Sequence, residues 1–202
     1  LAKIIAISNQ KGGVGKTTTS VNLAACLGKM GKKTLLVDAD PQGNATSGVA
    51  IDKSKVKFST YSILVDGAKA EQCVLTTPYD NLHILPSSLD LAAAELEIAE
   101  KPHREALLKN ALLPIKQYYD YIIIDCPPSL GLITANALTV ADTFLVPIQC
   151  EYYALEGLSQ LINTVRRIKR QLLLRKTKQH LRMYHLLKQR KNISFVFVLT
   201  KQ

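Results

Sequence analysis

One stretch decides the fold of this chain: Gln10-Lys11-Gly12-Gly13-Val14-Gly15-Lys16-Thr17, a glycine-rich loop with a lysine near each end. The apolar run Lys3–Ile7 precedes it, and a helical pattern from about Thr17 to Met30 follows it. Strand, glycine loop and helix in this order are the setting of a P-loop. The glycines let backbone N–H groups turn toward phosphate oxygens, and the positive end of the helix dipole faces the same anion.

Side chains in this loop suit particular parts of a nucleotide. Lys16 is placed to reach the terminal phosphates, and the Thr17 hydroxyl is placed to hold Mg²⁺. The predicted nucleotide contacts are Lys11, Gly12, Gly13, Val14, Gly15, Lys16, Thr17 and Thr18.

The loop departs from the strict P-loop pattern at Gln10, where that pattern has glycine. Lys11 then stands at the loop entrance, and a single subunit offers no obvious way for Lys11 and Lys16 to reach one phosphate. Lys11 could instead serve a nucleotide bound by a partner subunit. The alternative is a glycine-rich turn with two solvated lysines.

Two further apolar runs end in an acid. Thr34–Asp38 is typical of a buried parallel strand whose carboxyl end meets a ligand, and Asp40 follows in a loop enforced by Pro41 and Gly43. A carboxylate in that loop can orient a water for in-line attack on a terminal phosphoryl group. The alternative is an Asp-Pro turn with solvated acids.

The second run, Tyr121–Asp125, reads as a strand buried on both faces. An acid at its end is costly to bury unless it faces a cation or a donor. The sequence therefore predicts that Asp125 binds Mg²⁺ through a coordinated water. The alternative is that nearby backbone N–H groups satisfy this carboxylate. Cys126 beside it is interpreted as a small buried hydrophobe rather than a nucleophile.

These segments together resemble the ParA/Soj partition ATPases, which carry a deviant Walker motif and are related to MinD. The resemblance covers about residues 2–170 and rests on four ordered motifs: residues 10–19, 37–44, 122–129 and 147–157. It implies that Asp40 positions the attacking water and that Asp38 lies near Mg²⁺, with Lys16, Asp40 and Lys11 as the catalytic group. It also implies ATP and Mg²⁺ as cofactors, an ATP-dependent homodimer, a ParB/Spo0J-type partner and non-specific DNA binding in chromosome or plasmid segregation.

The order of elements predicts an α/β fold of the P-loop NTPase type, a mostly parallel sheet with helices on both faces. Besides the segments above, the patterns predict four helices or helical turns and two strands: helices near 60–65, from 88 to about 100, from Pro102 onward and at Gly131–Val140, and strands at 82–85 and Asp142–Pro147. Ligand binding at the carboxyl ends of the strands would place Lys16, Asp38, Asp40 and Asp125 in one crevice.

The positive charge is concentrated at one end of the chain. The net charge is +10 over 202 residues. Residues 166–202 hold 12 of the 26 lysines and arginines and no acid, whereas residues 1–165 carry a net charge of −2. Such a block would attract a polyanion such as DNA through its phosphates. Four separated cysteines without a metal-binding pattern suggest reduced thiols, and no apolar run has membrane-spanning length. A cytoplasmic, nucleoid-associated protein without stable membrane association is therefore expected.

The family pattern ends near Gln171. We expect an ATPase domain at residues 1–170 with a helix at about 153–170, then an atypical basic segment at 171–202 with a candidate strand at 193–200, in a chain truncated at its C-terminus. Accidental basicity and an evolved DNA-binding surface both fit this segment. Two rival functions stay open: a MinD-like membrane-associated ATPase, for which the tail would be a surface anchor, and an inactive nucleotide-binding product.

Overall fold

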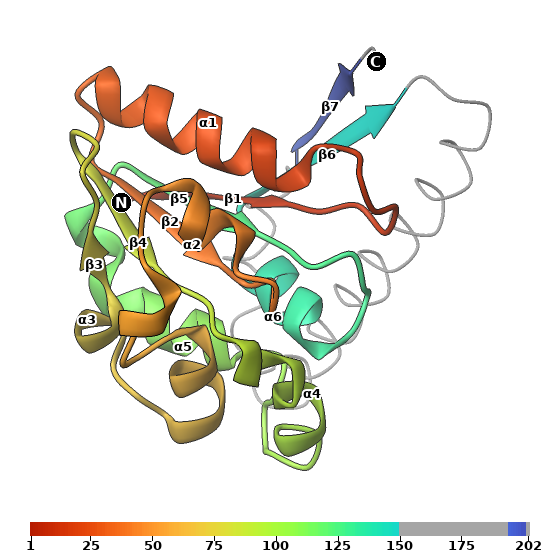
Figure 1. The fold of residues 1–202 in the computed structure, drawn as a ribbon. Helices are drawn as coiled ribbons and strands as arrows, with labels where there is room; N and C mark the ends of the chain where they lie inside the picture. Colours follow the sequence, from red (N-terminus) through yellow and green to blue (C-terminus); the bar gives the residue numbers. More distant parts are fainter. Residues whose placement is uncertain (150–193, 201–202) are drawn as a thin grey trace, which may run out of the picture.

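The computed structural model describes residues 1–149 and 194–200, which form a sheet covered by helices on both faces (Figure 1). The strand order is β3-β4-β2-β5-β1-β6-β7, and every pair is parallel except β3 with β4. The predicted α/β fold is thus confirmed. The strands are β1 (Lys3–Ile7), β2 (Thr34–Asp38), β3 (Leu75–Thr76), β4 (Leu82–Leu85), β5 (Tyr121–Asp125), β6 (Thr143–Gln149) and β7 (Ser194–Thr200).

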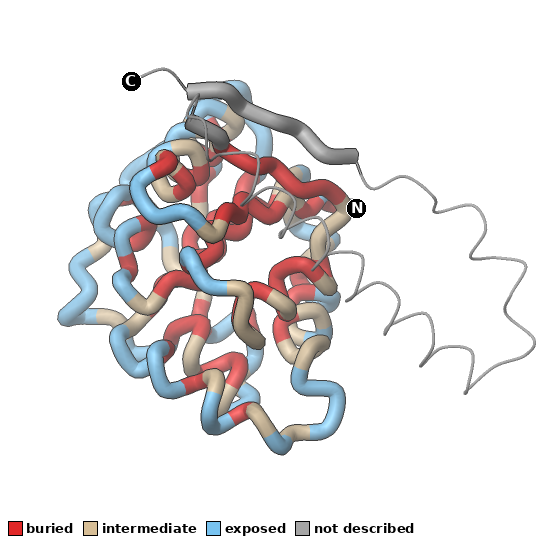
Figure 2. Tube along the Cα trace, turned by 90° about the vertical axis from the view of Figure 1, so that its right-hand side faces the viewer, coloured by how far each residue is buried: buried red, intermediate tan, exposed pale blue. Residues whose placement is uncertain are grey.

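The central strands separate two hydrophobic cores. In β5, Ile122 and Ile124 belong to one core and Ile123 to the other, as the alternation of side chains along a strand requires. Because both faces are buried, the strand reads as a continuous apolar run. Figure 2 shows the resulting distribution, with the buried strands inside and most exposed residues on the outer loops and helices.

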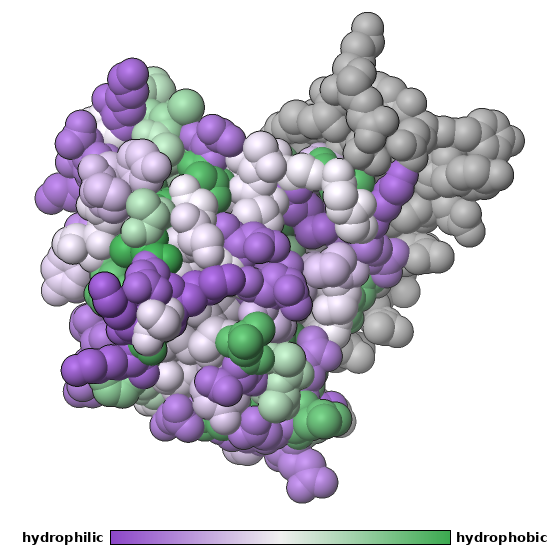
Figure 3. All heavy atoms as spheres, viewed as in Figure 1, coloured by the Kyte–Doolittle hydropathy of each residue, from purple (hydrophilic) through white to green (hydrophobic). Residues whose placement is uncertain are grey.

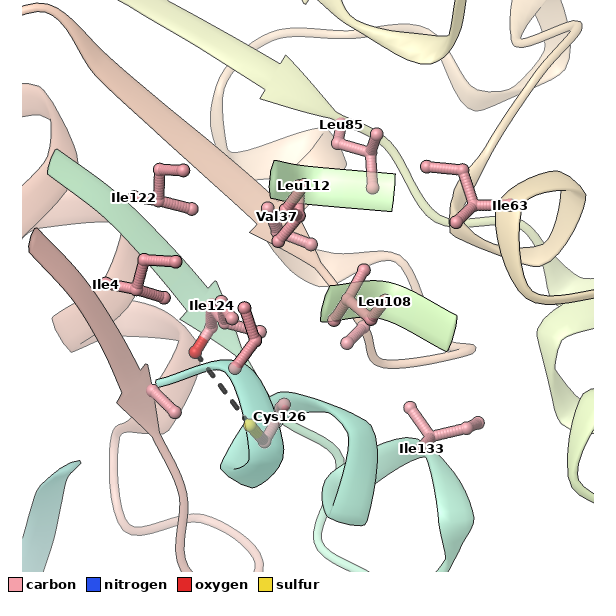
Figure 4. Packing of buried hydrophobic residues seen from close by; sticks show 14 of the residues in the cluster. Ile4, Val37, Ile63, Leu85, Leu108, Leu112, Ile122, Ile124, Cys126 and Ile133 are labelled. Carbon is pink, nitrogen blue, oxygen red and sulfur yellow. Dashed lines mark hydrogen bonds between the residues drawn. The ribbon is translucent and has the colours of Figure 1, made fainter. Parts of the chain in front are cut away.

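The larger core lies between the sheet and helices α5 and α6. Figure 4 shows Ile122 and Ile124 of β5 and Ile4 of β1 near Leu108 and Leu112 of α5. The second core packs under α1 and α2 on the opposite face. The helices are α1 (Lys16–Lys29), α2 (Asn44–Gly48), α3 (Ala70–Cys73), α4 (Ala94–Glu97), α5 (Leu107–Ile115) and α6 (Leu132–Val140).

Most predicted elements are present with small shifts at their ends. The helical segment expected near 60–65 contains a π-helical turn at Ser62–Asp66, and the expected strand at 142–147 is β6. The candidate strand at 193–200 is β7, which pairs with β6 in parallel from Thr143↔Ser194 onward. The helix expected at 153–170 and most of the basic segment lie outside the described residues.

The helix predicted from 88 to about 100 is wrong in extent. A 3₁₀ turn at Leu89–Ala92 and the short α4 replace it. Leu89 and Leu96 are 75% and 83% exposed, so the apolar residues of this segment do not share one packed face.

The helix expected from Pro102 begins only at Leu107. His103 has a φ of 54°, in the left-handed region, which interrupts any helix across this position.

The surface of the described part is mixed in polarity. In the view of Figure 3, hydrophilic side chains run across the middle of the molecule and hydrophobic ones form small separate patches. Within residues 1–149 and 194–200, no helix combines the length and apolarity needed to cross a bilayer.

Candidate nucleotide-binding site

The glycine loop joins β1 to α1 and leaves open space above its backbone. Gly13 and Gly15 have φ values of 72° and 83°, which favour glycine. A Cβ atom added at Gly12, Gly13 or Gly15 would meet no atom within 4 Å. Val14, by contrast, is buried and anchors the loop. The loop thus has room for a ligand against its backbone.

Helix α1 presents its N-terminus at the same place. Gly15 is the N-cap residue, so no side chain caps the helix, and its first turn contains no acid. Thr17 is half-buried and Thr18 is exposed. The uncapped N–H groups and the dipole favour an anion supplied from outside the helix.

Lys16 points inward rather than into solvent. Only 7% of the residue is exposed, and its Nζ donates a hydrogen bond to the carbonyl oxygen of Lys11 at 3.0 Å. Burial lowers the pKa of Lys16, while the charges of Asp125 and Asp40 act in the opposite direction. The site therefore contains a buried cation beside two carboxylates.

Asp125 ends β5 with one oxygen unused. Ser20 Oγ lies 2.8 Å from Oδ1 and donates to it, whereas the buried Oδ2 has no hydrogen-bond partner among residues 1–149 and 194–200. Burial raises the pKa of Asp125 to about 7, and hydrogen bonding from the Thr17 and Ser20 side chains opposes that rise. An orphaned buried carboxylate oxygen suits a cation or a cation-bound water.

Asp38 lies opposite Asp125 on the neighbouring strand β2, but its environment differs. Its Oδ1 accepts from the backbone N of Asp40 at 3.2 Å. Its Oδ2 accepts from both the backbone N and the Oγ1 of Thr46, each at 2.7 Å. Burial raises the pKa of Asp38 to about 6, although these hydrogen bonds lower it. Both oxygens are therefore already engaged within the chain.

Asp40 follows in a tight turn and is 8% exposed. Its Oδ1 accepts from the backbone N of Gln42 at 3.0 Å, and its carbonyl oxygen accepts from the N of Gly43 at 2.9 Å. Its charge acts on Lys16. The structure thus brings Lys16, Asp38, Asp40 and Asp125 together at the carboxyl ends of β1, β2 and β5.

Asn9 is a structural part of this site that the sequence patterns missed. Its Nδ2 donates to the carbonyl oxygen of Pro147 at 2.7 Å, and its Oδ1 accepts from the N of Lys11 at 3.1 Å. Asn9 thereby ties the start of the glycine loop to β6. Ser20 and Thr46 were missed as well; their only sequence signal is a hydroxyl residue close to a motif. Lys11 itself is exposed at the loop entrance.

The donor set fits Mg²⁺ better than a metal held by protein ligands alone. Among the described residues, no three His, Cys, Asp or Glu side chains gather as a complete metal site. Mg²⁺ commonly takes one or two protein ligands and fills its other positions with waters and phosphate oxygens. The Thr17 hydroxyl and the open Oδ2 of Asp125 meet that requirement.

Cys126 next to this acid is buried, and burial raises the pKa of its thiol. Its Sγ contacts the carbonyl oxygen of Ile124 at 3.9 Å (Figure 4). A buried thiol of this kind is inert, in line with its interpretation as a small hydrophobe.

The fold and the loop define a P-loop nucleotide-binding protein. A family model described as an AAA domain matches residues 2–195. The chain is 60% identical over 172 residues to the sporulation initiation inhibitor protein Soj of Bacillus subtilis, covering 85% of this chain and 68% of Soj. The chain therefore belongs to the ParA/Soj family.

Solved structures agree with this assignment. Cobyrinic acid a,c-diamide synthase from Mycobacterium smegmatis, with a bound ATP analogue and magnesium, superposes with a TM-score of 0.80 at 38% identity, covering 84% of this chain and 69% of that one. A putative plasmid partition protein from Borrelia burgdorferi bound to AMPPNP gives a TM-score of 0.76 at 30% identity, covering 98% of this chain and 73% of that one.

The chain is shorter than its relatives. It spans between 60% and 68% of the length of the first curated relatives that it matches.

Proposed function

We propose that this chain is the ATP-hydrolysing part of a ParA/Soj-type partition protein. One observation carries the proposal: the buried Lys16, under an open glycine loop, lies beside Asp125 at the end of β5 and Asp40 in the turn after β2. Relatives named as chromosome or plasmid partition proteins, and structures with bound ATP analogues, support it.

In this proposal the loop from Lys11 to Gly15 surrounds the phosphates with backbone N–H groups, and Val14 anchors it. The ammonium group of Lys16 has three donors, of which one is used by Lys11 O, so two remain for phosphate oxygens. The Thr17 hydroxyl and, through a water, Asp125 would hold Mg²⁺, while Thr18 lies in the first turn of α1. Mg²⁺, when bound, neutralises charge on the transferred phosphoryl group.

Asp40 is proposed to orient the attacking water. Its turn is fixed by two hydrogen bonds from backbone N–H groups: Gln42 N donates to the carboxylate Oδ1 and Gly43 N donates to the carbonyl oxygen. A carboxylate held beside the phosphate-binding lysine can accept a hydrogen bond from a water in line with the leaving group.

The assembly is also a proposal. ATP would close two subunits face to face, with the exposed Lys11 contacting the partner's nucleotide. The dimer would bind DNA non-specifically through basic residues such as those of 166–202, and a ParB-type protein would stimulate hydrolysis at the nucleoid. The division into an ATPase domain at 1–170 and a basic segment at 171–202 belongs to the same proposal.

ATP turnover of single-residue variants tests the assigned roles. Lys16→Ala should abolish measurable turnover, because it loses the lysine that binds the phosphates, and Asp40→Ala should lower turnover by about 100-fold, because it loses the carboxylate that orients the water. Lys32→Ala and Asp66→Ala, which change exposed residues elsewhere, serve as matched controls and should keep wild-type rates. Unchanged rates in the first pair would remove the assigned roles.

A further inference from the structure

Thr46 is a fully buried residue of α2 that connects the ends of β2 and β4. Its Oγ1 donates to Asp38 Oδ2 at 2.7 Å and accepts from the backbone N of Ser87 at 3.0 Å. A hydroxyl has one proton to donate and two lone pairs to accept with, so both bonds form at once. The backbone N of Thr46 donates to the same carboxylate oxygen.

This connection continues to Asp40. The other oxygen of Asp38 accepts from the backbone N of Asp40, so one carboxylate joins α2 to the turn that carries Asp40. The resulting chain of contacts runs from Ser87 through Thr46 and Asp38 to Asp40. Hydrogen bonds linked in this way in a buried environment hold one another in place.

The two strand-end acids are therefore unlike each other. The Asp38 carboxylate accepts from three donors, whereas one buried oxygen of Asp125 has no partner among the described residues. The open oxygen of Asp125 can accept from a metal-bound water. Both carboxylate oxygens of Asp38 already accept hydrogen bonds, one from the backbone of Asp40 and the other from the backbone and the side chain of Thr46.

We infer that Thr46 is a positioning residue for ATP hydrolysis: its hydroxyl orients the Asp38 carboxylate, which fixes the backbone of Asp40. Asp38 then acts on Asp40 and not on Mg²⁺, contrary to the metal role suggested by family resemblance. This inference rests on the proposed function, since Asp40 must act on the attacking water for its position to matter.

Thr60 provides a matched control in the same region. Thr60 is also fully buried, and its Oγ1 donates to the carbonyl oxygen of Asp38 at 2.7 Å. The carbonyl oxygen of Pro86 lies 3.2 Å from the same Oγ1. Thr60 thus joins the same two strand ends through their carbonyl oxygens, whereas Thr46 bonds to the Asp38 carboxylate. Replacing either threonine by valine keeps the shape and removes one buried hydroxyl.

The experiment measures kcat, KM for ATP, Mg²⁺-dependent ATP binding and the urea midpoint for Thr46→Val, Thr46→Ser, Thr60→Val and the wild type. Thr46→Val should lower kcat about 10- to 100-fold, as small displacements and lost supporting contacts do, with ATP affinity within about twofold. Thr46→Ser should restore kcat to within about threefold. Thr60→Val should lose a similar amount of stability and keep its kcat within about threefold.

Other results would overturn the inference in distinguishable ways. Equal loss of kcat in both valine variants would make Thr46 merely structural, and unchanged kcat in Thr46→Val would remove its role. A tenfold loss of Mg²⁺-dependent ATP binding in Thr46→Val would return Asp38 to the metal. A wild type that binds no ATP would refute the proposed function and this inference with it. If Thr46→Val does not fold, Thr46→Ala is compared with Thr60→Ala by the same criteria.

Discussion

Asp125 is the residue in which stability and proposed function conflict most clearly. Its carboxylate is fully buried, and Oδ2 has no partner in the part of the chain that the structure describes. Burial accordingly raises its pKa to about 7. An ionised group in this position destabilises the protein without ligands, and a bound cation would remove that cost.

The stability of the metal-free, nucleotide-free protein should therefore depend on pH through Asp125. A carboxyl whose folded pKa lies above its unfolded value of 3.8 keeps its proton on folding. Its contribution is most favourable below pH 3.8 and is lost as the pH rises through about 7. Asp125→Asn lacks this loss, so its free energy of unfolding relative to wild type should rise by roughly 2 kcal/mol between pH 5 and pH 8.

Urea unfolding at both pH values, in EDTA, measures this difference. Asp66→Asn, which changes an exposed acid, is the control and should show no such trend. A difference between Asp125→Asn and wild type that stays constant or shrinks with pH would show that the carboxylate is not held protonated by burial.

At the scale of elements, the glycine loop separates its two lysines. Lys16 is buried at the start of α1, whereas Lys11 is exposed at the entrance of the loop. Replacing each lysine by alanine should therefore affect a different step, ATP binding for Lys16 and dimerisation for Lys11. Lys16→Ala should abolish ATP binding, while Lys11→Ala should still bind ATP, with affinity within about threefold, and fail to dimerise.

Sedimentation with a non-hydrolysable ATP analogue distinguishes these outcomes. Asp40→Ala serves as the reference, because it keeps Lys11 and Lys16 and should therefore dimerise with the analogue; with ATP in its place, slow hydrolysis should make the Asp40→Ala dimer accumulate. Dimers of Lys11→Ala at the concentration that saturates Asp40→Ala would contradict a role for Lys11 toward the partner's nucleotide.

Strands were predictable from sequence because burial on both faces leaves an uninterrupted apolar run. The bounds of β2 and β5 match the predicted runs, including the acids at their ends. Helices packed through few residues were not predictable in this way. Residues 88–100 carry helical residues, but only Leu91, Ala94 and Ile98 are buried there, and the helix breaks into short turns.

The site residues that could be predicted from the sequence are those that belong to short local motifs. Lys16 begins a helix, Asp38 and Asp125 each end a strand, and Asp40 follows Asp38 by two residues, so parallel topology alone brings them together. Contacts between distant segments leave no such signal. Asn9 reaches Pro147, and Thr46 reaches Ser87, only after the sheet has formed.

At the scale of the whole molecule, the sheet brings the site together from four distant segments. The register places Ile7 of β1 beside Asp125 of β5, and Asp125 beside Asp38 of β2. Asn9 adds the end of β6. The site therefore depends on the folded sheet, and its acids are stabilised best when a cation and phosphates occupy it.

Calorimetric titration of the wild-type chain with ATP, with MgCl₂ and separately with EDTA, tests this account most directly. Lys16→Ala is the matched control, because it keeps the loop and loses the buried cation. We predict saturable binding of ATP in Mg²⁺, at least tenfold weaker binding in EDTA, and no measurable binding by Lys16→Ala. A folded wild type that takes up no ATP, or binds it equally well without Mg²⁺, would contradict the account.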